Sequence, residues 1–117
     1  IGLYVKDMDS SKKFYIEVLG FELRLDVQTD SGTKLCFLKN GTCEIELIEQ
    51  PTMQNVDGYF NHVALRVDDI ERAVGRMIAA GYEMEHEIRE MPMIYNGIKM
   101  VMFRGPDGER LEFNEFL

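Results

Sequence analysis

Hydrophobic residues alternate with other residues at the start of the chain and again near its middle. The alternation covers residues 1–5 and residues 63–67, and a period of two is typical of a half-buried β-strand. After each alternating segment, apolar residues recur every three or four positions, over about residues 8–19 and 70–80. This longer period is typical of an amphipathic helix. The pattern therefore predicts a strand followed by a helix at the beginning of each half of the chain.

Glycine and aspartate mark the predicted ends of both helices. Gly20 and Gly81 follow the two periodic segments, and glycine commonly ends a helix because it adopts a left-handed backbone conformation without strain. Aspartate side chains favour the position before a helix, where they accept hydrogen bonds from free backbone N–H groups. The candidate caps are Asp7 or Asp9 for the first helix and Asp68 or Asp69 for the second.

Further apolar segments predict the remaining strands. They cover residues 21–28, 32–39 and 42–49 in the first half and residues 82–90, 97–104 and 109–115 in the second. Asn40-Gly41 is a strong signal for a tight β-hairpin, and Gly105–Gly108 predicts a turn between the last two strands. Residues 50–60 contain proline, glycine, asparagine and aspartate, and this composition predicts a linker between the two halves.

The second half of the chain repeats the first. Residues 1–8 reappear as residues 63–70, displaced by 62 positions, and both halves have the order β-α-β-β-β. One helix covers only one face of such a sheet, so the other face stays open. We therefore expect an α+β fold in which two tandem βαβββ modules form a curved, partly open mixed sheet with helices on the convex side. The modules, residues 1–49 and 61–117, are expected to form a single domain over residues 1–117.

Composition and charge narrow the class of protein. The chain has 117 residues and a net charge of −8, with 13 basic and 21 acidic residues, which argues against a nucleic-acid partner. Its apolar runs are too short for a transmembrane span, so we expect no membrane partner. Cys36 and Cys43 do not make a disulfide framework, and a reducing, cytoplasmic location is expected. Ile1 is not a methionine, and we expect other residues to precede it in the natural chain.

Strand alternation predicts which side chains face the open side of each sheet. In the first strand these are Tyr4 and the residue before Ile1, and in the corresponding strand of the second half they are His62, Ala64 and Arg66. Each half also ends on a strand that carries one acidic residue between two apolar residues. A carboxylate in such a place needs a partner, because burying it without one is costly.

The first of these acidic residues is Glu46. A two-residue loop at Asn40-Gly41 pairs Leu35 with Glu46, since the loop sets the register of the hairpin. Glu46 then shares the open face with Leu35 and Phe37. The apolar residues on either side of it in the sequence face the helix.

The second acidic residue is Glu112. The turn at Gly105–Gly108 gives a register in which Glu112 shares its face with Val101 and Asn114. We therefore expect Glu112, like His62 and Glu46, to project to the uncovered side of its sheet.

The residues discussed so far match a known family. The chain resembles the vicinal-oxygen-chelate superfamily, which includes glyoxalase I, bleomycin-resistance proteins, methylmalonyl-CoA epimerase, fosfomycin-resistance enzymes and extradiol dioxygenases. The segments that carry the resemblance are Ile1–Asp7, Phe14-Tyr15, Leu19–Phe21, Asn61–Val67 and Phe103–Phe113. The resemblance covers essentially the whole chain and is closest to glyoxalase I-like proteins. It implies a glyoxalase-like domain, a fold that hosts several chemistries.

The resemblance also implies a set of metal ligands. In metal-dependent members a histidine opens the first strand, a glutamate ends the first half, a histidine opens the second half and a glutamate ends the second half. Carried over by position, the last three ligands are Glu46, His62 and Glu112, and the first would stand immediately before Ile1. Imidazole and carboxylate ligands suit a divalent Zn, Ni, Mn, Co or Fe ion and do not choose among them.

A reaction follows from the same resemblance. In glyoxalase-like members the metal binds two vicinal oxygens of a small substrate, and a metal-bound glutamate removes a proton next to a carbonyl. This implies a lactoylglutathione lyase-like enzyme, a lyase or isomerase, with Glu112 as the first choice for the base and Glu46 able to share the role. The expected substrate pocket contains Tyr4, Leu35, Phe37, Arg66, Met93 and Val101.

Dimerisation is the expected assembly. Single-chain members of this size usually pair so that halves of two subunits complete each active site, and an uncovered sheet face favours contact with a partner surface. We therefore expect a homodimer with shared active sites and metal ligands from both chains.

Two other functions are compatible with the same fold. A metal-free ligand-binding protein of the bleomycin-resistance type would use the same groove, but it has no need of an acid such as Glu46 or Glu112 at each strand end. An Fe(II) dioxygenase uses two histidines and one carboxylate, so the additional Glu46 argues against it.

Overall fold

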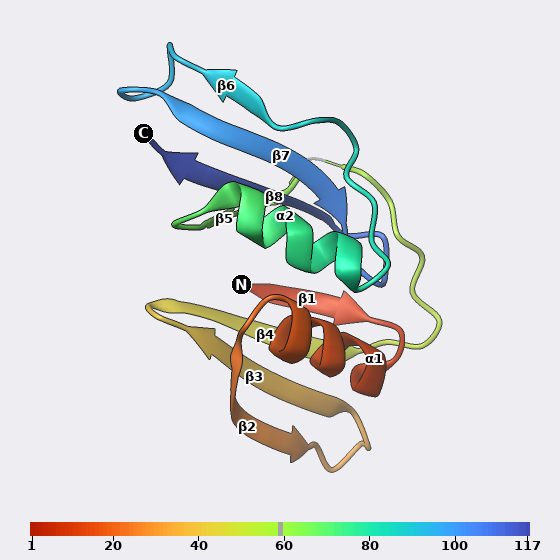
Figure 1. The fold of residues 1–117 in the computed structure, drawn as a ribbon. Helices are drawn as coiled ribbons and strands as arrows, with labels where there is room; N and C mark the ends of the chain where they lie inside the picture. Colours follow the sequence, from red (N-terminus) through yellow and green to blue (C-terminus); the bar gives the residue numbers. More distant parts are fainter. Residues whose placement is uncertain (59) are drawn as a thin grey trace. The chain divides into compact units, whose positions relative to one another are not determined.

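The computed structural model describes residues 1–58 and 60–117 of the chain and shows two compact units, Ile1–Asn55 and Val56–Leu117 (Figure 1). The boundary between the units falls within the linker predicted at residues 50–60, of which Tyr59 lies outside the described residues. Each unit contains the predicted β-α-β-β-β order.

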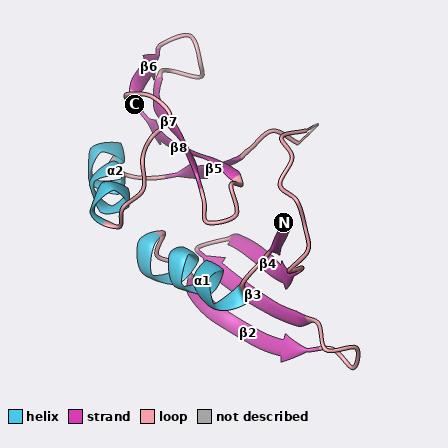
Figure 2. Ribbon diagram, turned by 90° about the vertical axis from the view of Figure 1, so that its right-hand side faces the viewer, coloured by secondary structure: helices cyan, strands magenta, loops and turns pink. Residues whose placement is uncertain are grey.

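The first unit is a four-stranded mixed sheet with a helix on one face (Figure 2). Its strands lie in the order β1 (Gly2–Val5), β4 (Cys43–Glu49), β3 (Lys34–Asn40) and β2 (Glu22–Gln28). Strand β1 is parallel to β4, whereas the other neighbours are antiparallel. Helix α1 (Met8–Lys13) continues directly into a π-helical segment, η1 (Phe14–Val18).

The second unit repeats this topology. Its sheet has the order β5 (Val63–Arg66), β8 (Arg110–Phe116), β7 (Ile98–Arg104) and β6 (Arg89–Met91), with β5 parallel to β8. Helix α2 (Ile70–Ala79) follows β5, as α1 follows β1. The sequence prediction of an α+β fold made of two tandem modules is therefore confirmed, and each module has its own mixed sheet.

Both helices begin and end as the sequence predicts. The Asp7 side chain accepts a hydrogen bond from the Ser10 backbone N–H at 3.1 Å, and Asp69 accepts one from the Arg72 N–H at 2.9 Å. Of the candidate caps, Asp7 and Asp69 therefore occupy the capping positions. Among the described residues, no helix is both long enough and apolar enough to cross a membrane.

A second carboxylate contacts the start of each helix, and the sequence did not reveal it. Glu49 Oε2 accepts from the Met8 backbone N–H at 2.8 Å, and Glu115 Oε2 accepts from the Ile70 N–H at the same distance. Each of these glutamates lies on the last strand of its unit. The helix is thereby connected to the sheet at a fixed point, and negative charge also complements the positive end of the helix dipole.

The cores lie between each helix and the face of the sheet that it covers. In the first unit Leu38, Ile45 and Leu47 are fully buried beneath the helix, as strand alternation predicts. In the second unit Phe103 and Leu111 occupy the equivalent places. The opposite face of each sheet contains the predicted ligands Glu46 and Glu112.

The hairpin between β3 and β4 has a different register from the predicted one. Asn40 pairs with Cys43, so the loop is Gly41-Thr42, and Glu46 is opposite Phe37. Gly41 has a φ of 60°, which suits the first position of a type II′ turn and is costly for other residues. Because the register differs by two residues, Glu46 still faces the open side.

The hairpin between β7 and β8 shows that the prediction for Val101 was wrong. Arg104 pairs with Arg110, so the loop includes Glu109, whose carboxylate accepts from the Asp107 backbone N–H at 2.8 Å. The one-residue shift places Met102 opposite Glu112. Val101 therefore faces α2 and is fully buried, because a shift of one residue exchanges the two faces of a strand.

The segment predicted as a strand at residues 82–90 is mostly irregular. Only Arg89–Met91 pairs continuously with β7, and Met84 makes an isolated bridge to Phe103. A pocket of about 660 Å³ lies between this segment and α2. It is on the helix side of the sheet, and its lining residues include Val74, Ile78, His86 and Val101.

Replacement of Glu115 tests the connection between helix and sheet. We expect Glu115→Ala to lower the free energy of unfolding by about 1–2 kcal/mol, since loss of a helix cap or of a hydrogen bond to a charged group has this magnitude. Glu115→Gln, which keeps an acceptor oxygen, should lose less. Urea denaturation followed by circular dichroism measures both, with the exposed Glu83→Ala as control. Equal stability of Glu115→Ala and the wild type would show that the contact between Glu115 and the start of α2 does not stabilise the fold.

Candidate metal and catalytic site

Glu112 lies in the middle of β8 on the face that α2 does not cover. Its neighbours across the sheet are Ala64 on β5 and Met102 on β7. The side chain is only 11% exposed, although it is a carboxylate. A carboxylate in such a position requires polar or charged neighbours.

His62 is the first of these neighbours. It immediately precedes β5, and its Nε2 atom lies 3.2 Å from Glu112 Oε2. Its side chain is 34% exposed, so the imidazole is partly accessible to solvent. The structure therefore brings together two of the three predicted metal ligands, both within the second unit.

The other oxygen of Glu112 has a separate partner. Asn114 lies two residues further along β8 and faces the same side of the sheet, as the sequence predicted. Its Nδ2 atom donates to Glu112 Oε1 at 3.2 Å. The two carboxylate oxygens thus have different environments, with an amide donor at one and an imidazole nitrogen at the other.

The second nitrogen of His62 contacts Asn61. The Nδ1 atom lies 2.8 Å from Asn61 Oδ1, and Arg110 Nη1 donates to the same oxygen at 2.8 Å. Arg110 lies two residues before Glu112 on β8. One asparagine oxygen therefore connects the imidazole ring to a charged residue on the neighbouring strand.

Arg110 forms an ion pair with the carboxylate of Glu85. Its Nη2 atom lies 2.8 Å from Glu85 Oε2, and Glu85 also accepts from Arg104 Nε at 3.0 Å. The hydrogen bond from Arg110 is the main reason that the pKa of Glu85 is lowered from its ordinary value. The same contact raises the pKa of Arg110. At near-neutral pH Glu85 is therefore negatively charged and Arg110 is positively charged.

Glu46 occupies the equivalent position in the first unit. It is half-buried, it pairs with Gly2 on β1 and Phe37 on β3, and it faces away from α1. Tyr4 and Leu35 lie on the same face, on either side of Ile48. The sequence prediction that these residues share one open face is confirmed within this unit.

The open face of the first unit includes several exposed apolar side chains. Tyr4, Leu25 and Val27 are 57%, 49% and 41% exposed, and Leu25 and Val27 pair with Phe37 and Leu35. Exposed apolar patches of this kind commonly mark a binding surface.

The open face of the second unit contains a cation next to aromatic side chains. Arg66 lies on β5 with its guanidinium carbon 4.4 Å from the centre of the Phe116 ring, a favourable cation–π distance. Tyr95 contacts the same ring, with the two centroids 5.1 Å apart. Met93 lies in the loop between β6 and β7 and is 73% exposed. Arg66 is therefore positioned by aromatic residues on the predicted side of the sheet.

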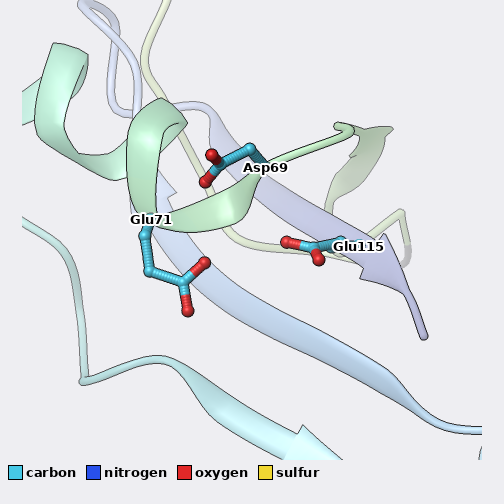
Figure 3. A group of neighbouring side chains, drawn as sticks. All are labelled: Asp69, Glu71 and Glu115. Atoms are coloured by element: carbon cyan, nitrogen blue, oxygen red, sulfur yellow. The ribbon is translucent and has the colours of Figure 1, made fainter.

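A group of three acidic residues also lies at the start of α2 (Figure 3). Ligand atoms of Asp69, Glu71 and Glu115 lie within 4.8 Å of one another. Asp69 and Glu115 accept hydrogen bonds from helix N–H groups, and Glu71 forms an ion pair with Lys99 at 2.7 Å. These contacts explain the group as a helix cap, and none of the predicted ligands belongs to it.

The cysteines do not contribute ligands to the site. Cys36 is fully buried on the helix side of β3, and burial together with Asp26 raises the pKa of its thiol to about 12. A protonated thiol is a poor metal ligand. Both Cys36 and Cys43 are free of disulfides, in agreement with the sequence prediction.

Sequence reasoning missed the polar residues that surround His62. Asn61 was named only within a segment that carries the family resemblance, and Glu85 and Arg110 received no role. Asn61 directly precedes the predicted ligand, and Arg110 precedes Glu112 by two positions, so it lies on the same face of the strand. These spacings could have indicated that Asn61 and Arg110 lie near the predicted ligands. Glu85 offered no such signal, because its segment is irregular.

Comparison with known proteins agrees with the fold. Residues 1–113 match the family model of the Glyoxalase/Bleomycin resistance protein/Dioxygenase superfamily. The chain belongs to this superfamily. The resemblance inferred from the sequence is thereby confirmed, and the superfamily assignment covers both units.

Individual members of the superfamily are similar over nearly their whole length. The chain is 35% identical to the uncharacterized protein YwbC of Bacillus subtilis, with 96% of the chain and 91% of YwbC covered. It is 34% identical to a lactoylglutathione lyase of Haemophilus influenzae, with 97% and 87% covered. The crystal structure of a glyoxalase family protein from Enterococcus faecalis has a TM-score of 0.83 at 26% identity, with 98% and 94% covered.

The lowered pKa of Glu85 predicts how stability depends on pH. Because the folded-state pKa lies below the ordinary value of 4.5, the stabilisation is present above that value and is lost as the pH falls through the folded-state pKa. We expect acidification from near-neutral pH to destabilise the wild type more than the Glu85→Gln variant. Urea denaturation at a series of pH values measures the difference. If the free energy of unfolding changed with pH in parallel for the two proteins, the ion pair of Glu85 would not contribute to the pH dependence of stability.

Proposed function

We propose that the protein is a metal-dependent, glyoxalase-like lyase or isomerase that abstracts a proton next to a carbonyl of a small substrate. The observation that carries this proposal is the close approach of His62 Nε2 and Glu112 Oε2, at 3.2 Å, on the open face of the second unit. Imidazole nitrogen and carboxylate oxygen together suit several divalent ions. The 34% identity to a lactoylglutathione lyase supports the same reaction class.

Glu46 is proposed as a further ligand because the repeat makes it the counterpart of Glu112. Glu46 pairs with Gly2 on a parallel first strand, and Glu112 pairs with Ala64 in the same way. By this register the residue before Ile1 is the counterpart of His62. A divalent ion of Zn, Ni, Mn, Co or Fe bound by these residues would supply Lewis-acid polarisation of the substrate oxygens.

Glu112 is proposed as the general base. Asn114 holds Oε1 with an amide hydrogen bond, so the orientation of the carboxylate is fixed and Oε2 is directed toward the open face near His62. A base must reach the proton that it abstracts, and a fixed orientation of this kind favours such a step. Glu46 is proposed to share this role.

The residues on the two open faces are proposed to bind the substrate. Tyr4, Leu35 and Phe37 would contact its apolar part, and Arg66 would bind an anionic group, since its guanidinium is already positioned over Phe116. The exposed Met93 would cover the substrate as an adaptable apolar side chain.

Metal content and activity of histidine variants test this proposal. We expect the wild type to bind a divalent ion near stoichiometry and to isomerise the hemithioacetal of methylglyoxal and glutathione. His62→Ala should lose most of the bound metal, and Glu112→Gln should lower kcat/KM by about 100-fold or more, the usual effect of removing a general base. His86→Ala, which changes a histidine in the pocket on the helix side, is the matched control.

Three outcomes would contradict the proposal. The first is a wild type that does not bind divalent metal, and the second is His62→Ala with an unchanged metal content. The third is tight binding of a small ligand that a chelator does not affect, which would favour a metal-free binding protein of the bleomycin-resistance type.

We propose in addition that the protein is a homodimer whose sites combine Glu46 of one protomer with His62 and Glu112 of the other. The exposed apolar face around Leu25 and Val27 supports contact with a second copy. We expect Glu46→Gln and Glu112→Gln each to have strongly reduced activity alone. When the two variants are unfolded, mixed and refolded together, heterodimers should regain one intact site, and activity should return.

Sedimentation and mixing separate the alternatives for this assembly. A monomer at micromolar concentration would contradict the dimer. A dimer whose mixed variants stay inactive would show that each chain completes its own site.

A further inference from the structure

We propose that Asn61, Arg110 and Glu85 form a positioning relay that fixes the tautomer of His62. The proposal rests on the function proposed above insofar as it explains why the imidazole is ready to bind a metal. The relay residues contact neither the proposed metal nor the substrate. They act only through His62, and their effect is visible in the protein without metal.

The direction of the hydrogen bonds follows from the chemistry of arginine. A guanidinium has five N–H donors and no acceptor. Because Arg110 Nη1 lies 2.8 Å from the Asn61 side chain, the Asn61 atom that it contacts must be the oxygen rather than the amide nitrogen. The position of the Asn61 amide is therefore determined by its charged neighbour.

The same oxygen determines the position of a proton on His62. Asn61 Oδ1 lies 2.8 Å from His62 Nδ1 and can only accept. This contact favours a hydrogen on Nδ1, in competition with Glu112 Oε2 beside Nε2, and in the neutral ring of that tautomer Nε2 keeps its lone pair. A histidine ligand binds a metal through such an unprotonated nitrogen.

This tautomer directs two acceptors at each other. The lone pair of Nε2 points toward Glu112 Oε2, which is 3.2 Å away and also has no hydrogen when it is ionised. Two acceptors at this distance repel each other unless a proton or a metal ion lies between them. The relay therefore prepares His62 and Glu112 to bind a proton or a metal ion between them.

Glu85 completes the relay by fixing Arg110. Arg110 Nη2 lies 2.8 Å from Glu85 Oε2, and its Nε is 3.2 Å from both Glu85 oxygens. This two-pronged contact leaves Nη1 free to reach Asn61, because the planar guanidinium presents its donors in a rigid fork. Arg104 donates to Glu85 at 3.0 Å and holds it from the other side.

The tautomer can be measured directly, without metal, by NMR of protein labelled with ¹⁵N at histidine. The chain contains two histidines, His62 and His86. His86 is an internal standard, because its Nδ1 lies 2.7 Å from the Glu87 backbone carbonyl oxygen, which only accepts. A pH titration identifies the neutral form of each ring.

We expect both histidines of the metal-free wild type to have the hydrogen on Nδ1 in their neutral forms. Asn61→Ala should shift His62 toward the other tautomer and leave His86 unchanged. Asn61→Asp keeps an acceptor oxygen and should preserve the wild-type tautomer. A wild-type His62 with its hydrogen on Nε2 would overturn the relay, and so would an Asn61→Ala variant with an unchanged His62 tautomer.

Metal affinity supplies the second measurement. In calorimetric titrations with Zn²⁺ alone, Asn61→Ala should bind about 10- to 100-fold more weakly than the wild type, the usual effect of losing an outer-shell partner. Asn61→Asp should bind much as the wild type does, and Asn96→Ala, which changes an exposed asparagine of the same unit, should have no effect. Unchanged Zn²⁺ affinity in Asn61→Ala would overturn the role of the relay in metal binding.

The two measurements separate the relay from the proposed function. A wild type with the expected tautomer but no affinity for divalent metals would contradict the metal-dependent function and leave the hydrogen-bonded relay in place. A wild type that binds metal but has the hydrogen of His62 on Nε2 would contradict the relay and leave the metal-dependent function in place. Amide NMR spectra of each variant show whether it is folded.

Discussion

Each unit depends on one constraint, namely that a single helix covers one face of a four-stranded sheet and is fixed to it by a carboxylate. Glu49 and Glu115 supply that carboxylate at the first N–H of α1 and α2. The contact joins the last strand of each unit to the start of its helix. It therefore fixes the start of the helix against the apolar face of the sheet, and the other face is left for binding.

The same strands provide the acidic residues of the open faces. Glu46 and Glu49 are three positions apart, as are Glu112 and Glu115, and residues separated by an odd number of positions face opposite sides of a strand. One glutamate of each pair is thus directed at the helix and the other at the open face. Moving either glutamate by one position would turn its own carboxylate to the wrong face of the strand.

Periodicity and the repeat predicted the order of elements, narrowed the helix caps to Asp7 or Asp9 and Asp68 or Asp69, and predicted the open-face position of Glu112, because these properties depend on local spacing. The sequence did not predict the loop that includes Glu109, and this one residue reversed the orientation of Val101. Nor did it predict the contact between Arg110 and Asn61, which are 49 positions apart. Such contacts depend on strand pairing and side-chain rotamers, which a single sequence does not specify.

The two modules have the same topology, but the side chains on their open faces differ. The open face of the first unit has exposed apolar side chains such as Leu25 and Val27 in addition to Glu46. The corresponding face of the second unit surrounds Glu112 with His62 and Asn114. A carboxylate that has an imidazole and an amide within hydrogen-bonding distance has a defined orientation, whereas an apolar face gives contact area without direction. This difference explains why the proposed base and the positioning relay both belong to the second module, although the repeat alone would assign the two halves equal parts.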